Sequence, residues 1–318
     1  MDHSYFYIEH PLRSWNIVFV FILMLNPPLS LLSDDLLNYI VDHVAELPTS
    51  NSDLFNLSIT DRAFTRSCQA YIFEDLYLGY GSGTSNSISK KLTKIRNILN
   101  DKPLFINRVR AIHLNVIRQR NKWLFNDPNF ITIIQLLAKS LMPPHKLHLT
   151  GLSDPFIIED PILVVGRLMQ SFFSQTLTVL YLIDCKNVPL ALFLVCPNLK
   201  EVYLDDVEVF ESRDDEYPDT QCSGRELPAL DCLNYRNSES LVKQMITPPP
   251  NFSMAVIDWS KLRVLMLYPQ DKEGMVCLQP IFDAACNTLE ELYLTHDTNL
   301  RLTLERSTTS KMWQFLST

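Results

Sequence analysis

Hydrophobic positions recur with helical spacing soon after the Pro27-Pro28 pair. Apolar residues at 36, 37, 40, 41 and 44 form one stripe of an amphipathic helix. Ser33 precedes the stripe as an N-cap, and Asp34 and Asp35 follow in the first turn, where carboxylates are favoured by the helix dipole. Shorter apolar runs at 54–59 and 64–72 predict two further short helices. These helices carry more apolar side chains than so small a module buries by itself, which favours a partner surface.

A short strand is predicted over residues 74–78, followed by a glycine-rich turn at 79–85 and a helix over 88–99. From residue 109 the pattern Leu-x-x-Leu-x-Leu alternates with helix-like segments. Its copies begin at residues 109, 144, 177, 199, 227, 262 and 289, and the predicted helices span 127–141, 160–175, 189–195, 238–246 and 274–286. A repeated strand and helix with uneven spacing predicts an irregular leucine-rich-repeat solenoid.

Composition narrows the class of protein. The chain has 318 residues, is 47% hydrophobic and 20% charged, and carries a net charge of -8. This balance indicates a packed globular protein and disfavours a general nucleic-acid binder. Its seven cysteines show no C-x-x-C pair and no zinc spacing, so reduced thiols in the cytoplasm or nucleus are expected.

Charge is unevenly distributed. Residues 90–122 hold ten Lys and Arg against one acid, and residues 205–219 hold eight acids against one Arg. We interpret both segments as solvated surface. The alternative for the acidic segment is a site that receives a basic part of a partner, and for the basic segment a contact with an acidic partner.

An apolar segment, Trp15–Leu25, lies near the N-terminus. Its eleven residues are too few to span a membrane and match the length of a signal-peptide core. The preceding residues lack a positive region, and no small-x-small cleavage site follows. We therefore expect no membrane association, and the alternatives are a docked extra element, an upstream extension or secretion.

Signatures of enzymes are not found. The sequence contains no G-x-S-x-G elbow, no phosphate-binding G-x-x-x-x-G-K-[ST] loop and no H-E-x-x-H motif. Gly79, Gly81 and Gly83 depart from the dinucleotide fingerprint at Thr84, so a flexible joint is the simpler interpretation. His145 and His148 are predicted to lie on opposite faces of a strand, which separates them as metal ligands. No catalytic residue, cofactor or metal is expected.

Residues 31–78 carry a family resemblance. The segments that carry it are Leu32–Val44, Leu57–Phe64 and Tyr71–Phe73, supported downstream by Leu92–Leu99, Pro103 and Val109–Leu114. This part of the chain resembles an F-box in the divergent form of the fungal families that join it to leucine-rich repeats. The usual Leu-Pro opening is Leu32-Ser33 here, and the common Trp is Phe64.

The resemblance implies a substrate receptor of an SCF-type ubiquitin ligase, acting in ubiquitin-dependent protein degradation. The implied partners are a Skp-type adaptor, through it the cullin/RING ligase core, and an unidentified client protein. The residues expected to bind the adaptor are Leu32, Leu36, Ile40, Leu54, Leu57 and Ile59, and the alternative is that they form an ordinary core against the first repeat. The residues expected to bind the client are Tyr181, Tyr203, Met266 and Tyr293, with packing as the alternative.

The expected fold class is α+β, with a small N-terminal helical F-box-like module followed by an irregular α/β leucine-rich-repeat solenoid. The expected division of the chain is an N-terminal extension (1–28), the F-box-like module (29–78), a flexible joint and linking helix (79–108) and the repeat domain (109–318). The chain is expected to be a non-catalytic ligase subunit. Two alternatives are a leucine-rich-repeat interaction scaffold that works without the adaptor and a secreted repeat protein.

Overall fold

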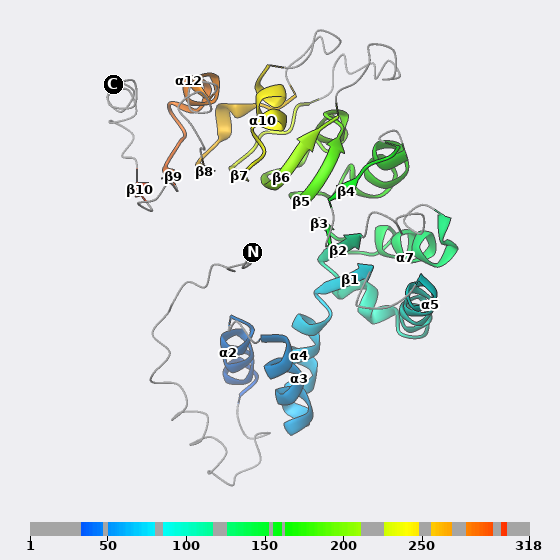
Figure 1. Ribbon diagram of the computed structural model, residues 1–318. Coiled ribbons are helices and arrows are strands. Elements are labelled where there is room, and N and C mark those ends of the chain that lie inside the picture. The colour runs from blue at the N-terminus through cyan, green and yellow to red at the C-terminus, as the bar shows by residue number, and fades with distance from the viewer. Residues whose placement is uncertain are drawn as a thin grey trace. The chain divides into compact units, whose positions relative to one another are not determined.

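The computed structural model divides the chain into two compact units, residues 1–72 (unit 1) and 73–318 (unit 2). Figure 1 shows the elements of both units. The described residues are 33–46, 50–79, 85–116, 126–152, 155–160, 163–210, 226–247, 256–268, 278–294 and 300–303. Each unit is treated below by itself.

The described part of unit 1 is built from three helices, α2 (Asp34–Ala45), α3 (Ser50–Thr60) and α4 (Arg62–Ile72). Ser33 caps α2 as its side chain accepts a hydrogen bond from the backbone N–H of Leu36 at 3.4 Å. The apolar sides of the three helices meet in one small core. Its members are Leu37, Val41, Val44, Leu54, Leu57, Phe64 and Cys68.

Two side-chain hydrogen bonds join α4 to α2. The Ser67 hydroxyl donates to Asn38 Oδ1 at 2.6 Å, and the Tyr71 hydroxyl donates to Asp42 Oδ1 at 2.7 Å. These polar contacts fix the relative position of two helices whose shared core is small.

Unit 2 contains one ten-stranded sheet with the order β1-β2-β3-β5-β6-β7-β8-β9-β10, and β4 pairs with β5. The strands are β1 (Asp75–Gly79), β2 (Ala111–Val116), β3 (Lys146–Gly151), β4 (Phe156–Ile157), β5 (Val179–Val188), β6 (Glu201–Val209), β7 (Cys232–Arg236), β8 (Val264–Tyr268), β9 (Glu291–Leu294) and β10 (Leu300–Thr303). All neighbouring strands are parallel except β10, which pairs antiparallel with β9.

Helices cover one face of this sheet, and α5, α7, α10 and α12 lie on its same side in Figure 1. The helical elements are α5 (Ser85–Asp101), the 3-10 turn η2 (Pro103–Arg108), α7 (Pro128–Ala138), the π-helix η4 (Val164–Phe173), α9 (Ala191–Leu194), α10 (Glu239–Ile246), the 3-10 turn η5 (Trp259–Lys261) and α12 (Gln279–Ala285). Their apolar side chains form a continuous core with the sheet.

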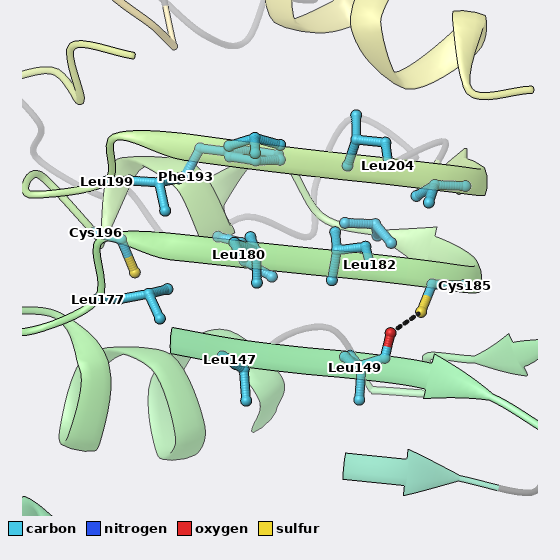
Figure 2. Packing of buried hydrophobic residues seen from close by; sticks show 14 of the residues in the cluster. Leu147, Leu149, Leu177, Leu180, Leu182, Cys185, Phe193, Cys196, Leu199 and Leu204 are labelled. Carbon is cyan, nitrogen blue, oxygen red and sulfur yellow. Dashed lines mark hydrogen bonds between the residues drawn. The ribbon is translucent and has the colours of Figure 1, made fainter. Parts of the chain in front are cut away.

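The sheet contributes to this core through leucines that lie in register on successive strands. Leu147 pairs with Leu180, and Leu149 pairs with Leu182. Figure 2 shows these side chains pointing to the same side, together with Cys185, whose thiol donates to the Leu149 carbonyl at 3.4 Å. Burial raises the pKa of the Cys185 thiol to about 12, so this cysteine is a neutral packing residue.

The expected fold class is wrong. The described strands form one continuous and mainly parallel sheet with helices packed on it, which is an α/β fold, and a leucine-rich-repeat solenoid following a helical F-box is not shown. The cause of the error is physical. Any parallel strand buried under helices requires apolar residues in the positions of the Leu-x-x-Leu-x-Leu pattern, so this pattern does not separate the two architectures. The strand β1, placed inside the 29–78 module from the sequence, belongs to this sheet.

Among the described helices, none combines the length and the apolar character needed to cross a membrane. The Trp15–Leu25 segment lies outside the described residues.

Candidate protein-interaction surfaces

The second face of the unit 2 sheet carries one residue per strand in a single row. The row consists of Tyr77, His113, His148, Tyr181, Tyr203, Asn234, Met266 and Tyr293, which pair in register from β1 to β9. Each of them lies between two inward-pointing residues of its strand, and side chains alternate along a strand, so the row points away from the helices. We call this side of the sheet the open face.

Five rings of this row stack on one another. The rings of Tyr77, His113, His148, Tyr181 and Tyr203 follow with centroid distances of 4.2, 4.0, 3.9 and 4.1 Å. Successive ring planes are inclined by 26° at most. We call these five residues the ring stack. Because the three inner rings are covered on both flat sides, they present their edges along the open face.

Hydrogen bonding, burial and charge set the pKa values of Asp75 and His148. His113 Nε2 lies 2.9 Å from Asp75 Oδ1, and this hydrogen bond holds the pKa of the Asp75 carboxyl below its ordinary value. His148 has a pKa lowered to about 4, first by burial and then by the charge of His113. His148 is therefore a neutral ring at pH 7.

Carboxylates border the other part of the row. The Tyr203 hydroxyl donates to Glu201 at 3.0 Å, and Tyr293 donates in the same way to Glu291, two residues before it. Burial raises the pKa of the Tyr203 hydroxyl, so it remains a hydrogen-bond donor at pH 7. Each tyrosine thereby orients the glutamate beside it.

The four residues expected to contact a client lie together on the open face. Tyr181, Tyr203, Met266 and Tyr293 occupy the same register row. Sequence reasoning missed the rings that complete it, Tyr77, His113 and His148. One signal in the sequence could have identified them. Each lies between two apolar residues of a strand, as His113 lies between Ile112 and Leu114, and the four expected residues occupy the same position in their own strands.

The six residues expected to bind an adaptor fall into different environments. Leu36 and Ile59 are exposed at 44% and 69%, whereas Leu54 and Leu57 lie in the unit 1 core among α2, α3 and α4. Ile40 is half-buried against this core. Leu32 lies outside the described residues.

Unit 1 also exposes two large aromatic side chains that the sequence reasoning did not select. Tyr39 and Phe55 are 58% and 57% exposed. On α2, Leu36 and Tyr39 are one helical turn apart, and on α3 Phe55 and Ile59 are one turn apart. Each of these two helices thus buries one apolar side and exposes another apolar pair.

Within the described parts of the chain, no three His, Cys, Asp or Glu side chains gather as ligands for a metal ion. Burial raises the pKa of Cys68 and Cys232 to about 11 and that of Cys196 to about 12, which disfavours the reactive thiolate. Of the glycine-rich turn only Gly79 is described, and it ends β1.

No protein-family model matches this chain, and a search of curated proteins finds no match either. Function is therefore inferred from the residues and their geometry.

Proposed function

We propose that this protein is the substrate-recognition subunit of an SCF-type ubiquitin ligase. Unit 1 binds a Skp-type adaptor, which connects it to the cullin/RING core, and unit 2 binds a client protein. The chain itself carries out no chemistry. It raises the concentration of the client near the ligase, in the cytoplasm or the nucleus.

The observation that carries the proposal is the pair of exposed apolar positions on each of two neighbouring helices of unit 1. Leu36 and Tyr39 on α2, and Phe55 and Ile59 on α3, are all more than 40% exposed. Large exposed apolar side chains at helical spacing favour a protein contact, in which such residues serve as anchors. The resemblance of residues 31–78 to an F-box supports a Skp-type adaptor as that partner.

The open face supports the role of unit 2. Its row of aromatic side chains, which are half-buried except for the exposed Tyr77, offers rigid, amphipathic contact area, and ordering these side chains on binding costs little conformational entropy. Because Tyr181, Tyr203 and Tyr293 lie in one row, a client segment laid across the strands contacts all of them.

A second function, an interaction scaffold that works without an adaptor, is favoured by one observation. Leu54 and Leu57 are 2% and 6% exposed, so two of the six expected adaptor contacts are committed to the core. In this case unit 2 keeps its binding role and unit 1 binds no ligase component.

The deciding experiment is co-purification of the full chain with the Skp-type adaptor of the same organism. The test variant carries Leu36→Asp and Ile59→Asp, because both side chains are exposed and substitutions at exposed positions usually change stability little. We expect a stable complex with the unmodified chain and at least a tenfold lower yield of adaptor with the variant.

A matched control carries Leu104→Asp and Leu141→Asp in unit 2, at positions 76% and 90% exposed. Circular dichroism of both variants checks that they are folded. The control should retain the adaptor. Absence of a complex with the unmodified chain contradicts the ligase function and favours the scaffold.

A further inference from the structure

On the open face between β6 and β9, two tyrosine–glutamate pairs are separated by uncharged, non-aromatic side chains of β7 and β8. We call this region the Tyr–Glu patch, and its residues are Glu201, Tyr203, Cys232, Asn234, Val264, Met266, Glu291 and Tyr293. They form two adjacent register rows, one from Glu201 to Glu291 and one from Tyr203 to Tyr293. All are half-buried except Cys232, which is buried.

The two pairs lie three strand spacings apart, with β7 and β8 between them. Parallel strands lie about 4.8 Å apart, so Glu201 and Glu291 are separated by roughly 14 Å. On the strands between them the tyrosine row holds Asn234 and Met266, whose side chains lie 3.4 Å apart from Nδ2 to Sδ. Neither side chain is aromatic, so the ring stack ends at Tyr203, and the ring side of Tyr203 that does not contact Tyr181 is directed toward β7.

The charged members of the patch are both negative, Glu201 and Glu291. Two arginines lie next to it: Arg236, which is paired with Asp205 through its Nε at 2.6 Å, and Arg301, the register partner of Tyr293 on β10. The Cys232 thiol, between the two glutamates, has its pKa raised to about 11 by burial, and both glutamate charges add to this shift. The potential of both carboxylates therefore extends over the middle of the patch.

We propose that the Tyr–Glu patch binds an extended basic peptide segment through an arginine side chain placed between Tyr203 and Tyr293. The identification of this segment as part of a client rests on the proposed function. The binding itself does not.

Arginine fits the arrangement better than other side chains. Its planar guanidinium stacks on a tyrosine ring and donates two parallel hydrogen bonds to a carboxylate, and its aliphatic stem packs on apolar side chains such as Met266 and Val264. A tyrosine hydroxyl already orients each carboxylate, which lowers the entropy lost on binding. Nucleic acid, the other ligand that stacked rings suit, is disfavoured because its phosphates would face Glu201 and Glu291.

The test measures binding of the purified full chain to a fluorescein-labelled peptide of alternating arginine and serine by fluorescence anisotropy. The comparison probes are a peptide of alternating aspartate and serine and an oligothymidylate of the same length. We expect the arginine peptide to bind at least tenfold more tightly than either. The double variant Glu201→Gln and Glu291→Gln should weaken its binding at least tenfold.

The control variant carries Asp101→Asn and Glu159→Gln, which remove the same two charges at exposed positions outside the patch. It should bind the arginine peptide within about twofold of the unmodified chain. A second variant, Met266→Arg, places a cation of the chain's own in the patch and should weaken binding even if the glutamine variant proves unfolded.

Three results would overturn the proposal: no binding of the arginine peptide, equal weakening in the control, or tighter binding of the oligothymidylate. Because the assay contains no adaptor, its outcome is independent of whether unit 1 joins a ligase. A failed adaptor test together with peptide binding would leave the patch in place and remove only its link to degradation.

Discussion

At the scale of single residues, the strictest requirement lies at Gly79, the last residue of β1. Its φ of +116° belongs to the region that favours glycine. A Cβ atom at this position would lie 2.1 Å from the backbone oxygen of Asn115, its register partner on β2. Both the backbone conformation and the close approach of β2 therefore require the absence of a side chain.

The variant Gly79→Ala should be destabilised by about 2–4 kcal/mol, because strain and a clash with backbone add together. Urea unfolding followed by circular dichroism measures the change. The matched control is Gly166→Ala in η4, where a Cβ meets no atom within 4 Å. Since alanine is the better helix former, this control should be stabilised by about 0.5–1 kcal/mol. Equal effects at both positions would refute the account of Gly79.

At the scale of elements, the ring stack couples five strands through side chains on the open face. Its inner member His148 lies between His113 and Tyr181, with ring distances of 4.0 and 3.9 Å. Protonation of His148 would place a charge in this half-buried position next to His113. For this reason its pKa in the folded chain is about 4, below the ordinary value of 6.5.

This lowered pKa implies a loss of stability in mild acid. Between pH 6.5 and about 4 the unfolded chain binds a proton at His148 that the folded chain does not, so the free energy of unfolding falls with the pH. We expect the melting temperature to be lower at pH 5 than at pH 7. The variant His148→Phe keeps a ring in the stack without a titrating group, and it should show a smaller difference.

Burial also lowers the pKa of His145, so part of the pH dependence of the melting temperature should remain in the His148→Phe variant. Asp75, whose pKa is held below 3.8, acts at lower pH than the measured interval. An unchanged difference between pH 5 and pH 7 in the His148→Phe protein would contradict the assignment.

The elements themselves were largely accessible from the sequence. The cap at Ser33 and the apolar stripe after it predicted α2, and the Leu-x-Leu positions predicted the strands β2, β3 and β5, because local spacing determines both. How the strands assemble was not accessible. The pattern is the same for every parallel strand under helices, so it neither identified the single α/β sheet nor included β1 in it.

The candidate surfaces could be predicted only in part, because local spacing does not determine which strands become neighbours. Tyr181 and Tyr203 stood out as large amphipathic side chains, but the ring stack depends on register between strands far apart in sequence, such as His113 beside His148. On unit 1, spacing alone did not separate the exposed Ile59 from the buried Leu57, because α3 carries apolar residues on more than one side.

At the scale of the whole molecule, the buried residues in the described parts of the chain form two separate hydrophobic cores. The core of unit 1 contains Phe64, which is 1% exposed, and that of unit 2 extends from Leu78 to Leu292. The two sets share no buried residue. Stability is therefore a property of each unit.

The variant Phe64→Ala leaves a cavity in the small core of unit 1 and should cost it about 3–5 kcal/mol. Hydrogen exchange followed by mass spectrometry should then show faster exchange in α2, α3 and α4, with the strands of unit 2 unchanged. Leu180→Ala in β5 is the matched change in the other core and should give the reverse pattern. Equal loss of protection in both units in either variant would show that they unfold as one.

The strand order has a consequence for how the chain acquires its structure during synthesis. From β5 onward each strand pairs with the one that precedes it in the chain, and β1, β2 and β3 follow the same rule. A ribosome therefore releases every strand of this path after its partner has already emerged, and the growing sheet always offers a paired neighbour to the next segment. Sheet formation can proceed from the N-terminal side without waiting for distant parts of the chain, which shortens the time that unpaired apolar strands spend exposed to aggregation.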